Sequence, residues 1–84
     1  MSATKEIRDL AATFGWDAHT DDSRRQDTFL HGQHMIAVDY CRDGSVRGAS
    51  RYEFVSIADP RFREETRGHD KKGDVESWLI KLGD

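Results

Sequence analysis

Two histidines, His31 and His34, flank the short Gly32-Gln33 segment, and their imidazole side chains are able to bind a metal ion or to transfer protons. Neutral imidazole binds zinc, and its ordinary pKa lets it transfer protons near neutral pH. Nothing around them matches the ligand spacing of a zinc finger, so we expect no metal site and interpret both as surface residues of a hairpin. The other side chains that could join a metal there are His19, Cys41, His69 and Asp70.

Cys41 is the single cysteine of the sequence, and it precedes Arg42. A neighbouring cation favours the thiolate form, which is the nucleophile of cysteine chemistry. The chain nevertheless contains no nucleophile elbow, phosphate-binding loop or HExxH segment. We therefore expect a protein that is not an enzyme and needs no cofactor. An enzyme that depends on Cys41 or on a metal is the lesser alternative.

The chain has 84 residues, enough for one domain over 1–84, with 36% hydrophobic and 35% charged residues. Its net charge of −3 does not draw the whole molecule to nucleic acid or to anionic membranes. No apolar run approaches the roughly 18–20 residues that span a bilayer. The N-terminal residues lack the apolar core of a signal peptide, and a lone cysteine fits a reducing compartment. We expect a cytoplasmic protein without membrane contact.

Two segments near the ends of the chain have the apolar spacing i, i+3, i+4 and i+7 of an amphipathic helix. The first covers residues 4–14, and Gly15 follows where a C-terminal cap is expected. The second begins after Asp70 or Asp74, either of which can cap it, and ends at Gly83. The two apolar stripes are Ile7, Leu10, Ala11 and Phe14 in the first helix and Val75, Trp78, Leu79 and Leu82 in the second.

Between these helices, alternating apolar residues predict strands over 16–20, 27–31, 34–41 and 45–57. Each helix needs an apolar surface to cover its stripe, and a sheet between them in sequence supplies one. The sequence therefore predicts an α+β domain of two layers. In it, three or four antiparallel strands form a meander, and both helices pack on one face of the sheet.

Two turns determine which side chains share a face of this sheet. Gly32-Gln33 suits a two-residue type II′ turn, which needs glycine first. For the second turn, a three-residue Arg42-Asp43-Gly44 loop keeps the apolar residues together, whereas a two-residue turn would mix them with arginines. The expected pairs are Phe29 with Ile36, Leu30 with Met35, Tyr40 with Val46, Val38 with Gly48, and Ile36 with Ser50. The predicted core face is Phe29, Ile36, Val38, Tyr40, Val46, Tyr52 and Phe54, with Gly48 and Ser50 leaving room for a helix.

The opposite face of the predicted sheet is half apolar, although no helix remains to cover it. An apolar centre with arginine at its edge is a common composition of protein interfaces. We therefore expect this face to bind a protein partner or a second copy of the chain, with Asp39 and Arg47 forming a cross-strand ion pair. The predicted partner-binding residues are Leu30, Met35, Ala37, Asp39, Arg47, Ala49, Arg51 and Val55.

Residues 58–73 combine Asp59-Pro60, alternating charges and two glycines. This composition predicts a long, mobile, charged connection between the last strand and the second helix. In an alternative arrangement, the segment folds back over the half-apolar face with Phe62 as its anchor and leaves no surface for a partner.

Basic residues concentrate between positions 42 and 73, where eight Arg or Lys accompany six acids. Binding of nucleic acid is therefore the alternative function, and it predicts an affinity that falls steeply with salt. The helix–strands–helix order and the segment Gly68-His69-Asp70-Lys71-Lys72 resemble a double-stranded-RNA-binding domain, in which two such lysines contact phosphates. Asp74 departs from that pattern. The residues of this alternative are Arg47, Arg51, Arg61, Arg63, Arg67, Lys71 and Lys72.

Several short runs spread over most of the chain carry a further resemblance. They are Gly15-Trp16, Asp27-Thr28-Phe29-Leu30-His31-Gly32, Ile36-Ala37-Val38-Asp39-Tyr40, Asp43-Gly44-Ser45-Val46, Arg51-Tyr52, Lys72, and Val75 to Leu79. On these runs the chain resembles small proteins encoded by actinobacterial phages of the mycobacteriophage kind. The resemblance implies a fold, a phage source and a place in the host cytoplasm, and it carries no activity. Nine Arg against four Lys, with no Asn, independently indicate a GC-rich genome. Together these features predict a phage accessory protein that binds a host or phage protein.

Overall fold

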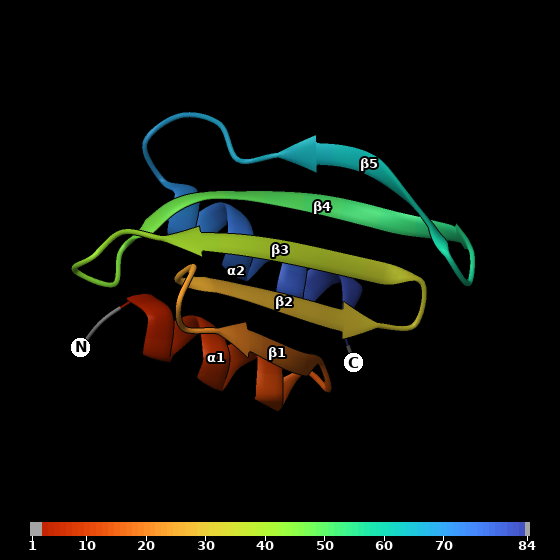
Figure 1. The fold of residues 1–84 in the computed structure, drawn as a ribbon, viewed down its shortest axis with the longest axis horizontal. Coiled ribbons are helices and arrows are strands. Elements are labelled where there is room, and N and C mark those ends of the chain that lie inside the picture. The colour runs from red at the N-terminus through yellow and green to blue at the C-terminus, as the bar shows by residue number, and fades with distance from the viewer. Residues whose placement is uncertain (1–2, 84) are drawn as a thin grey trace.

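The structure is a computed structural model, and it describes residues 3–83 as two layers: an antiparallel sheet with two helices on one of its faces (Figure 1). The sheet is a five-stranded meander whose strand order follows the sequence. The predicted α+β class, the meander and the shared face of the helices are confirmed, with one strand more than expected. The elements are α1 (Ala3–Thr13), β1 (Asp17–Asp21), β2 (Gln26–His31), β3 (His34–Tyr40), β4 (Val46–Ser56), β5 (Asp59–Glu65) and α2 (Lys71–Leu82).

Both helices direct their apolar stripes toward the same side of the sheet. Asp70 caps α2, because its carboxylate accepts a hydrogen bond from the backbone N–H of Gly73 at 3.0 Å. The indole N–H of Trp16 donates to the Leu79 carbonyl at 3.0 Å and so links the start of β1 to the end of α2. The buried core consists of Ile7, Ala11, Trp16, Phe29, Ile36, Val38, Tyr40, Ala49, Val75, Trp78 and Leu79.

Both predicted turns are confirmed. Gly32 has a φ of 58° and Gln33 keeps a negative φ, as a type II′ turn requires. Gly44 has a φ of 90°, and the Cys41 N–H donates to the Ser45 carbonyl at 2.8 Å across a three-residue loop. The pairs next to the turns are those expected: Phe29 with Ile36, Leu30 with Met35, and Tyr40 with Val46.

A β-bulge at Arg47 makes the rest of the predicted register wrong. Tyr40 lies opposite Val46, but the next pair joins Asp39 to Gly48, so Arg47 is an extra residue in β4. The turn prediction was correct, and the shift comes from the strand that follows it. A slip of one residue exchanges the two faces of a strand, because its side chains alternate with a period of two.

The bulge therefore moves side chains of β4 to the face opposite from the one predicted. Ala49 lies opposite Val38 on the helix face and is 6% exposed. Tyr52 and Phe54, predicted as core, lie on the side of the sheet away from the helices. Gly48 lies on that side too. No atom of either helix lies within 4 Å of the position that its Cβ would take, so the expected close approach of a helix at Gly48 does not occur.

Part of the predicted connection over 58–73 is a strand. β5 (Asp59–Glu65) pairs with β4 across a two-residue turn at Ile57 and Ala58 and extends the sheet by one edge strand. Pro60 is tolerated there because an edge strand leaves one side of its backbone unpaired. β5 lies beside the half-apolar face and does not fold over it, so the alternative in which this segment covers that face is wrong.

One ion pair is built into the helix–sheet interface. Asp27 in β2 is fully buried, and its carboxylate accepts hydrogen bonds from Arg8 Nε at 2.8 Å and Arg8 Nη2 at 3.1 Å. The Thr20 hydroxyl donates a third bond to the same carboxylate, at 2.8 Å. These bonds compensate a charge that would be costly to bury alone, and they hold α1 against β1 and β2.

The Tyr40 hydroxyl is buried near this carboxylate and has no hydrogen-bond partner in good geometry among the described residues. Burial, reinforced by the neighbouring Asp27, raises the pKa of Tyr40 well above its ordinary value. In the unfolded chain the phenol ionises near pH 10. The contribution of Tyr40 to the free energy of unfolding is therefore complete below pH 10 and is lost as the pH rises above it.

The Tyr40→Phe variant removes both the ionisable group and the unpartnered hydroxyl. We expect its free energy of unfolding at neutral pH to stay within about 1 kcal/mol of the wild-type value, because no good hydrogen bond is lost. Between about pH 9 and pH 11 it should lose less stability than the wild type. Urea denaturation of both proteins across this pH range measures the difference. An equal loss of unfolding free energy in the two proteins at alkaline pH would contradict the raised pKa of Tyr40.

Candidate partner-binding face

The open face is the side of the sheet that points away from both helices, and no helix or strand of the described chain covers it (Figure 1). Antiparallel partners point to the same side, so the register arranges its residues in rows across the strands. The first row, near the β2–β3 turn, is Asp17, Leu30, Met35, Tyr52 and Phe62. The second row is His19, Thr28, Ala37, Ser50 and Glu65. The third row is Asp21, Gln26, Asp39 and Gly48, and Phe54 with Pro60 stand beyond the first row.

One end of the open face is apolar. Phe62 is 56% exposed, and its ring lies edge-on to that of Tyr52 with 6.0 Å between the ring centroids. Such an aromatic pair gives a rigid surface of low conformational entropy, which suits a contact residue. We call Leu30, Met35, Tyr52, Phe54 and Phe62 the apolar end.

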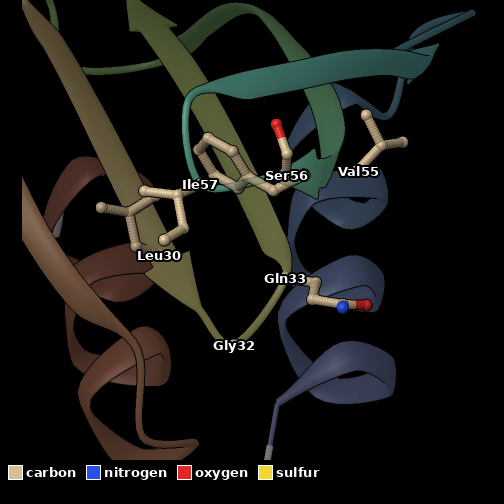
Figure 2. Close-up of a pocket in the computed structure, with 7 residues that line it drawn as sticks. Leu30, Gly32, Gln33, Val55, Ser56 and Ile57 are labelled. Atoms are coloured by element: carbon tan, nitrogen blue, oxygen red, sulfur yellow. The ribbon is translucent and has the colours of Figure 1, made fainter.

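A hollow of about 480 Å³ borders the apolar end, between the β2–β3 turn and the β4–β5 turn. All three of Leu30, Ile57 and Gln33 line it, and in Figure 2 Leu30 and Ile57 are on one side of the view while the Gln33 side chain points away from them. Ile57 occupies the β4–β5 turn and is fully exposed. The volume is in the range of ligand pockets, so a large apolar side chain of a partner can enter it. Its lining residues are Leu30, Gly32, Gln33, Phe54, Val55, Ser56 and Ile57.

Half of the predicted partner-binding residues lie where the sequence placed them. Leu30, Met35, Ala37 and Asp39 all belong to the rows of the open face, and each is partly buried. They come from β2 and β3, the strands whose register was predicted correctly.

The other half come from β4, and the bulge changes the positions of three of them. Ala49 is a core residue and cannot contact a partner. Arg51 lies opposite Ile36 on the helix face, and Arg47 is the exposed extra residue of the bulge. The expected ion pair of Asp39 with Arg47 is wrong, since Asp39 lies opposite Gly48.

Val55 is 54% exposed and lines the hollow, so it stays at the border of the face. The sequence patterns did not reveal Tyr52, Phe54 and Phe62 as residues of the open face. The signal that could have revealed them is Gly48, because a glycine inside a strand pattern often marks a bulge.

Charges are segregated between the two sides of the sheet. The rows of the open face contain four carboxylates and no Lys or Arg. On the other side, Arg51 donates to Glu64 at 2.8 Å and Arg63 to Glu53 at 2.9 Å. Arg51 and Arg63 therefore pair away from the open face, whose rim is acidic. The four carboxylates of that rim are Asp17, Asp21, Asp39 and Glu65.

The basic residues of the nucleic-acid alternative are mostly engaged within the protein. Lys72 pairs with Glu6 of α1, and this contact raises the pKa of Lys72 and lowers that of Glu6. Lys71 Nζ donates to the backbone carbonyl of Arg47 at 3.0 Å, and Arg61 pairs with Asp59 at 3.3 Å. Five of the seven residues thus have intramolecular partners, and nucleic-acid binding stays a prediction. The five are Arg51, Arg61, Arg63, Lys71 and Lys72.

The histidines and the cysteine do not gather into one site. Within the part of the chain that the structure describes, no group of three or more His, Cys, Asp or Glu side chains is arranged to hold a metal ion. The His31 ring packs against Trp16, with 5.4 Å between the ring centroids. Cys41 is a partly buried free thiol at the end of β3, and His19 lies in the second row of the open face.

Comparisons with known proteins add no relative. No family model matches the chain, and no match was found among curated proteins or among solved structures. The functional conclusion therefore depends on the residues of this chain. In the described residues, no helix has the length and apolar character needed to cross a membrane.

Proposed function

We propose that this protein is a small non-enzymatic binding module whose open face binds another protein or a second copy of the chain. The observation that supports this function is the row Leu30, Met35, Tyr52 and Phe62, which presents apolar side chains across four strands with no covering element. Phe62 of this row is exposed and the other three side chains are partly buried, and apolar side chains gathered on an uncovered surface often mark an interaction site. A phage source and action in the host cytoplasm, on a host or phage protein, form part of this proposal and rest on the sequence resemblance.

The edges of the sheet favour a face contact over strand addition. β1 is short and carries Asp17 and Asp21 at its two ends. β5 contains Pro60, and charged residues such as Arg61 and Arg63 alternate with uncharged residues along it. Short strands, charges and proline are the usual means by which proteins prevent edge-to-edge pairing.

A matched set of glutamine variants tests the proposed function. The double variant Met35→Gln, Phe62→Gln makes the apolar end polar without adding charge, and Ile80→Gln alters an exposed residue of α2 that is 49% exposed. The chain is used to capture proteins from an actinobacterial lysate, and its own association is measured by analytical ultracentrifugation. We expect the captured partner, or the dimer, to be lost in the double variant and kept in Ile80→Gln.

Circular dichroism spectra of the variants establish that the fold is retained. Loss of the Tyr52–Phe62 ring contact should cost about 0.5–1.5 kcal/mol of stability, which a domain of this size tolerates. Capture and association that are both unchanged in the double variant would overturn the proposed function.

A further inference from the structure

The acidic rim of the open face is a feature that a purely apolar contact does not require. Asp17, Asp39 and Glu65 form no ion pair with any residue that the structure describes, and they lie on three different strands. Asp21 also lies on this face, near the β1–β2 turn, where it accepts a hydrogen bond from Ser23 at 2.7 Å and forms an ion pair with Arg24 at 3.7 Å, so it contributes less to the charge of the rim. Unpaired carboxylates beside an apolar surface create a local negative potential.

Three of the four carboxylates of this face, Asp21, Asp39 and Glu65, are separated from the apolar end along the strands, whereas Asp17 lies at the β1 edge of the first row, opposite Leu30. Leu30 of the first row and Gln26 of the third are four residues apart on β2, which corresponds to about 13 Å at the usual rise of a strand. The hollow beside Leu30 lies at the apolar end, and Asp21 and Asp39 lie at the opposite end. A segment that crosses the face along β3, away from Asp17 at the β1 edge, thus meets the apolar Met35 first and Asp39 afterwards.

These charges disfavour a second copy of the chain as the occupant. A symmetric dimer through the open face joins the same surface on both subunits. Depending on its orientation, such a dimer places carboxylates against carboxylates or buries them against the apolar end. Both arrangements leave unpaired charges in a contact, which is costly. The same rim repels the phosphates of nucleic acid.

We propose that the open face binds a peptide segment of another protein in which one or two large apolar residues are followed by a cluster of Lys or Arg. This inference rests on the proposed function of the face and specifies the partner. The apolar residues occupy the hollow and contact Met35 and Phe62. The basic residues lie over Asp39 and Glu65, where charge complementarity determines which partners are accepted.

A random 12-residue peptide library, displayed in vitro and selected on the full chain, tests the proposal. We expect the enriched peptides to combine aromatic or aliphatic residues with several Lys or Arg. Affinity for one enriched synthetic peptide is then measured with three variants of the chain. The first is Met35→Gln, Phe62→Gln, and the second is Asp17→Asn, Asp39→Asn, Glu65→Gln. The third, a control with the same change in net charge away from the open face, is Asp9→Asn, Glu64→Gln, Glu76→Gln.

Peptide binding should be lost in the Met35 and Phe62 variant. It should weaken about tenfold in the variant without the three rim carboxylates, because each exposed ion pair contributes modestly. The control should bind like the wild type, and added salt should reduce the wild-type affinity.

The results that contradict the inference can be distinguished from those that contradict the proposed function. Peptides that need Met35 and Phe62 but bind equally well without the rim carboxylates overturn the inference and leave the function standing. A wild-type dimer that becomes monomeric in the Met35 and Phe62 variant also overturns the inference, since a second copy then occupies the face. The inference is also overturned if the selection enriches no peptide that contains Lys or Arg and needs the open face for binding. Peptide binding that is unchanged in the Met35 and Phe62 variant overturns both the inference and the proposed function.

Discussion

Ala49→Lys should unfold the protein or reduce its free energy of unfolding by about 3 kcal/mol or more, whereas Ser50→Lys, one residue further along β4, should change it by less than about 1 kcal/mol. Ala49 is buried opposite Val38 under the helices, so a lysine there brings an unpaired charge into the core. Ser50 lies on the open face opposite Glu65, where a lysine remains in solvent and gains a favourable neighbour. Domains of this size have a total stability on the order of 5–10 kcal/mol, so the first loss is a large share.

Urea denaturation of the two lysine variants is a test of the bulge at Arg47. Without the bulge, β4 would present Ser50 to the core and Ala49 to solvent, and the two results would be exchanged. A stable Ala49→Lys variant together with an unfolded Ser50→Lys variant would therefore show that Tyr52 and Phe54 are core residues and that the apolar end does not exist.

The second large effect concerns the pair of Arg8 with Asp27. Arg8→Met should reduce the free energy of unfolding by about 2–3 kcal/mol, because the fully buried Asp27 carboxylate then keeps one side-chain hydrogen-bond donor among the described residues, the Thr20 hydroxyl. We place the loss below the usual range for buried pairs because the Arg8 side chain is 41% exposed and water reaches the guanidinium. Thermal or urea denaturation at neutral pH measures it.

The double variant Arg8→Met, Asp27→Leu is the matched control for that prediction. It replaces both charges by apolar groups, and such replacements are often neutral or stabilising. We expect it to regain most of the stability that Arg8→Met loses. A double variant as unstable as the single one would mean that the loss comes from packing of the Arg8 side chain and not from the uncompensated charge of Asp27.

Local sequence signals predicted most of the fold. The helix boundaries, the cap of α2 (Asp70, one of two candidates with Asp74), the type II′ turn at Gly32 and the three-residue loop at Gly44 all depend on residues within a few positions of one another. Such features follow from backbone sterics and short-range hydrogen bonds, so they can be recognised without tertiary information.

The bulge and β5 could not be predicted in the same way. A bulge depends on how β4 packs under the helices, and that packing favours Ala49 in the core over Ser50. β5 is rich in charge and contains Pro60, so its composition favours a loop, and it forms a strand by pairing with the long β4. The bulge accounts for the three predicted partner-binding residues that were placed wrongly, since Arg47, Ala49 and Arg51 all lie on β4.

The most direct test of the central proposal is to determine where a partner contacts the chain. A photoreactive phenylalanine analogue is placed at Phe62 on the open face or at Ile80 on α2, two positions of similar exposure at 56% and 49%. Both proteins are irradiated in an actinobacterial lysate, and the adducts are analysed by mass spectrometry. We expect a specific adduct from position 62 that disappears when Met35→Gln is added, and none from position 80. Adducts that form equally at both positions, or at position 80 alone, would contradict the assignment of the open face as the binding surface.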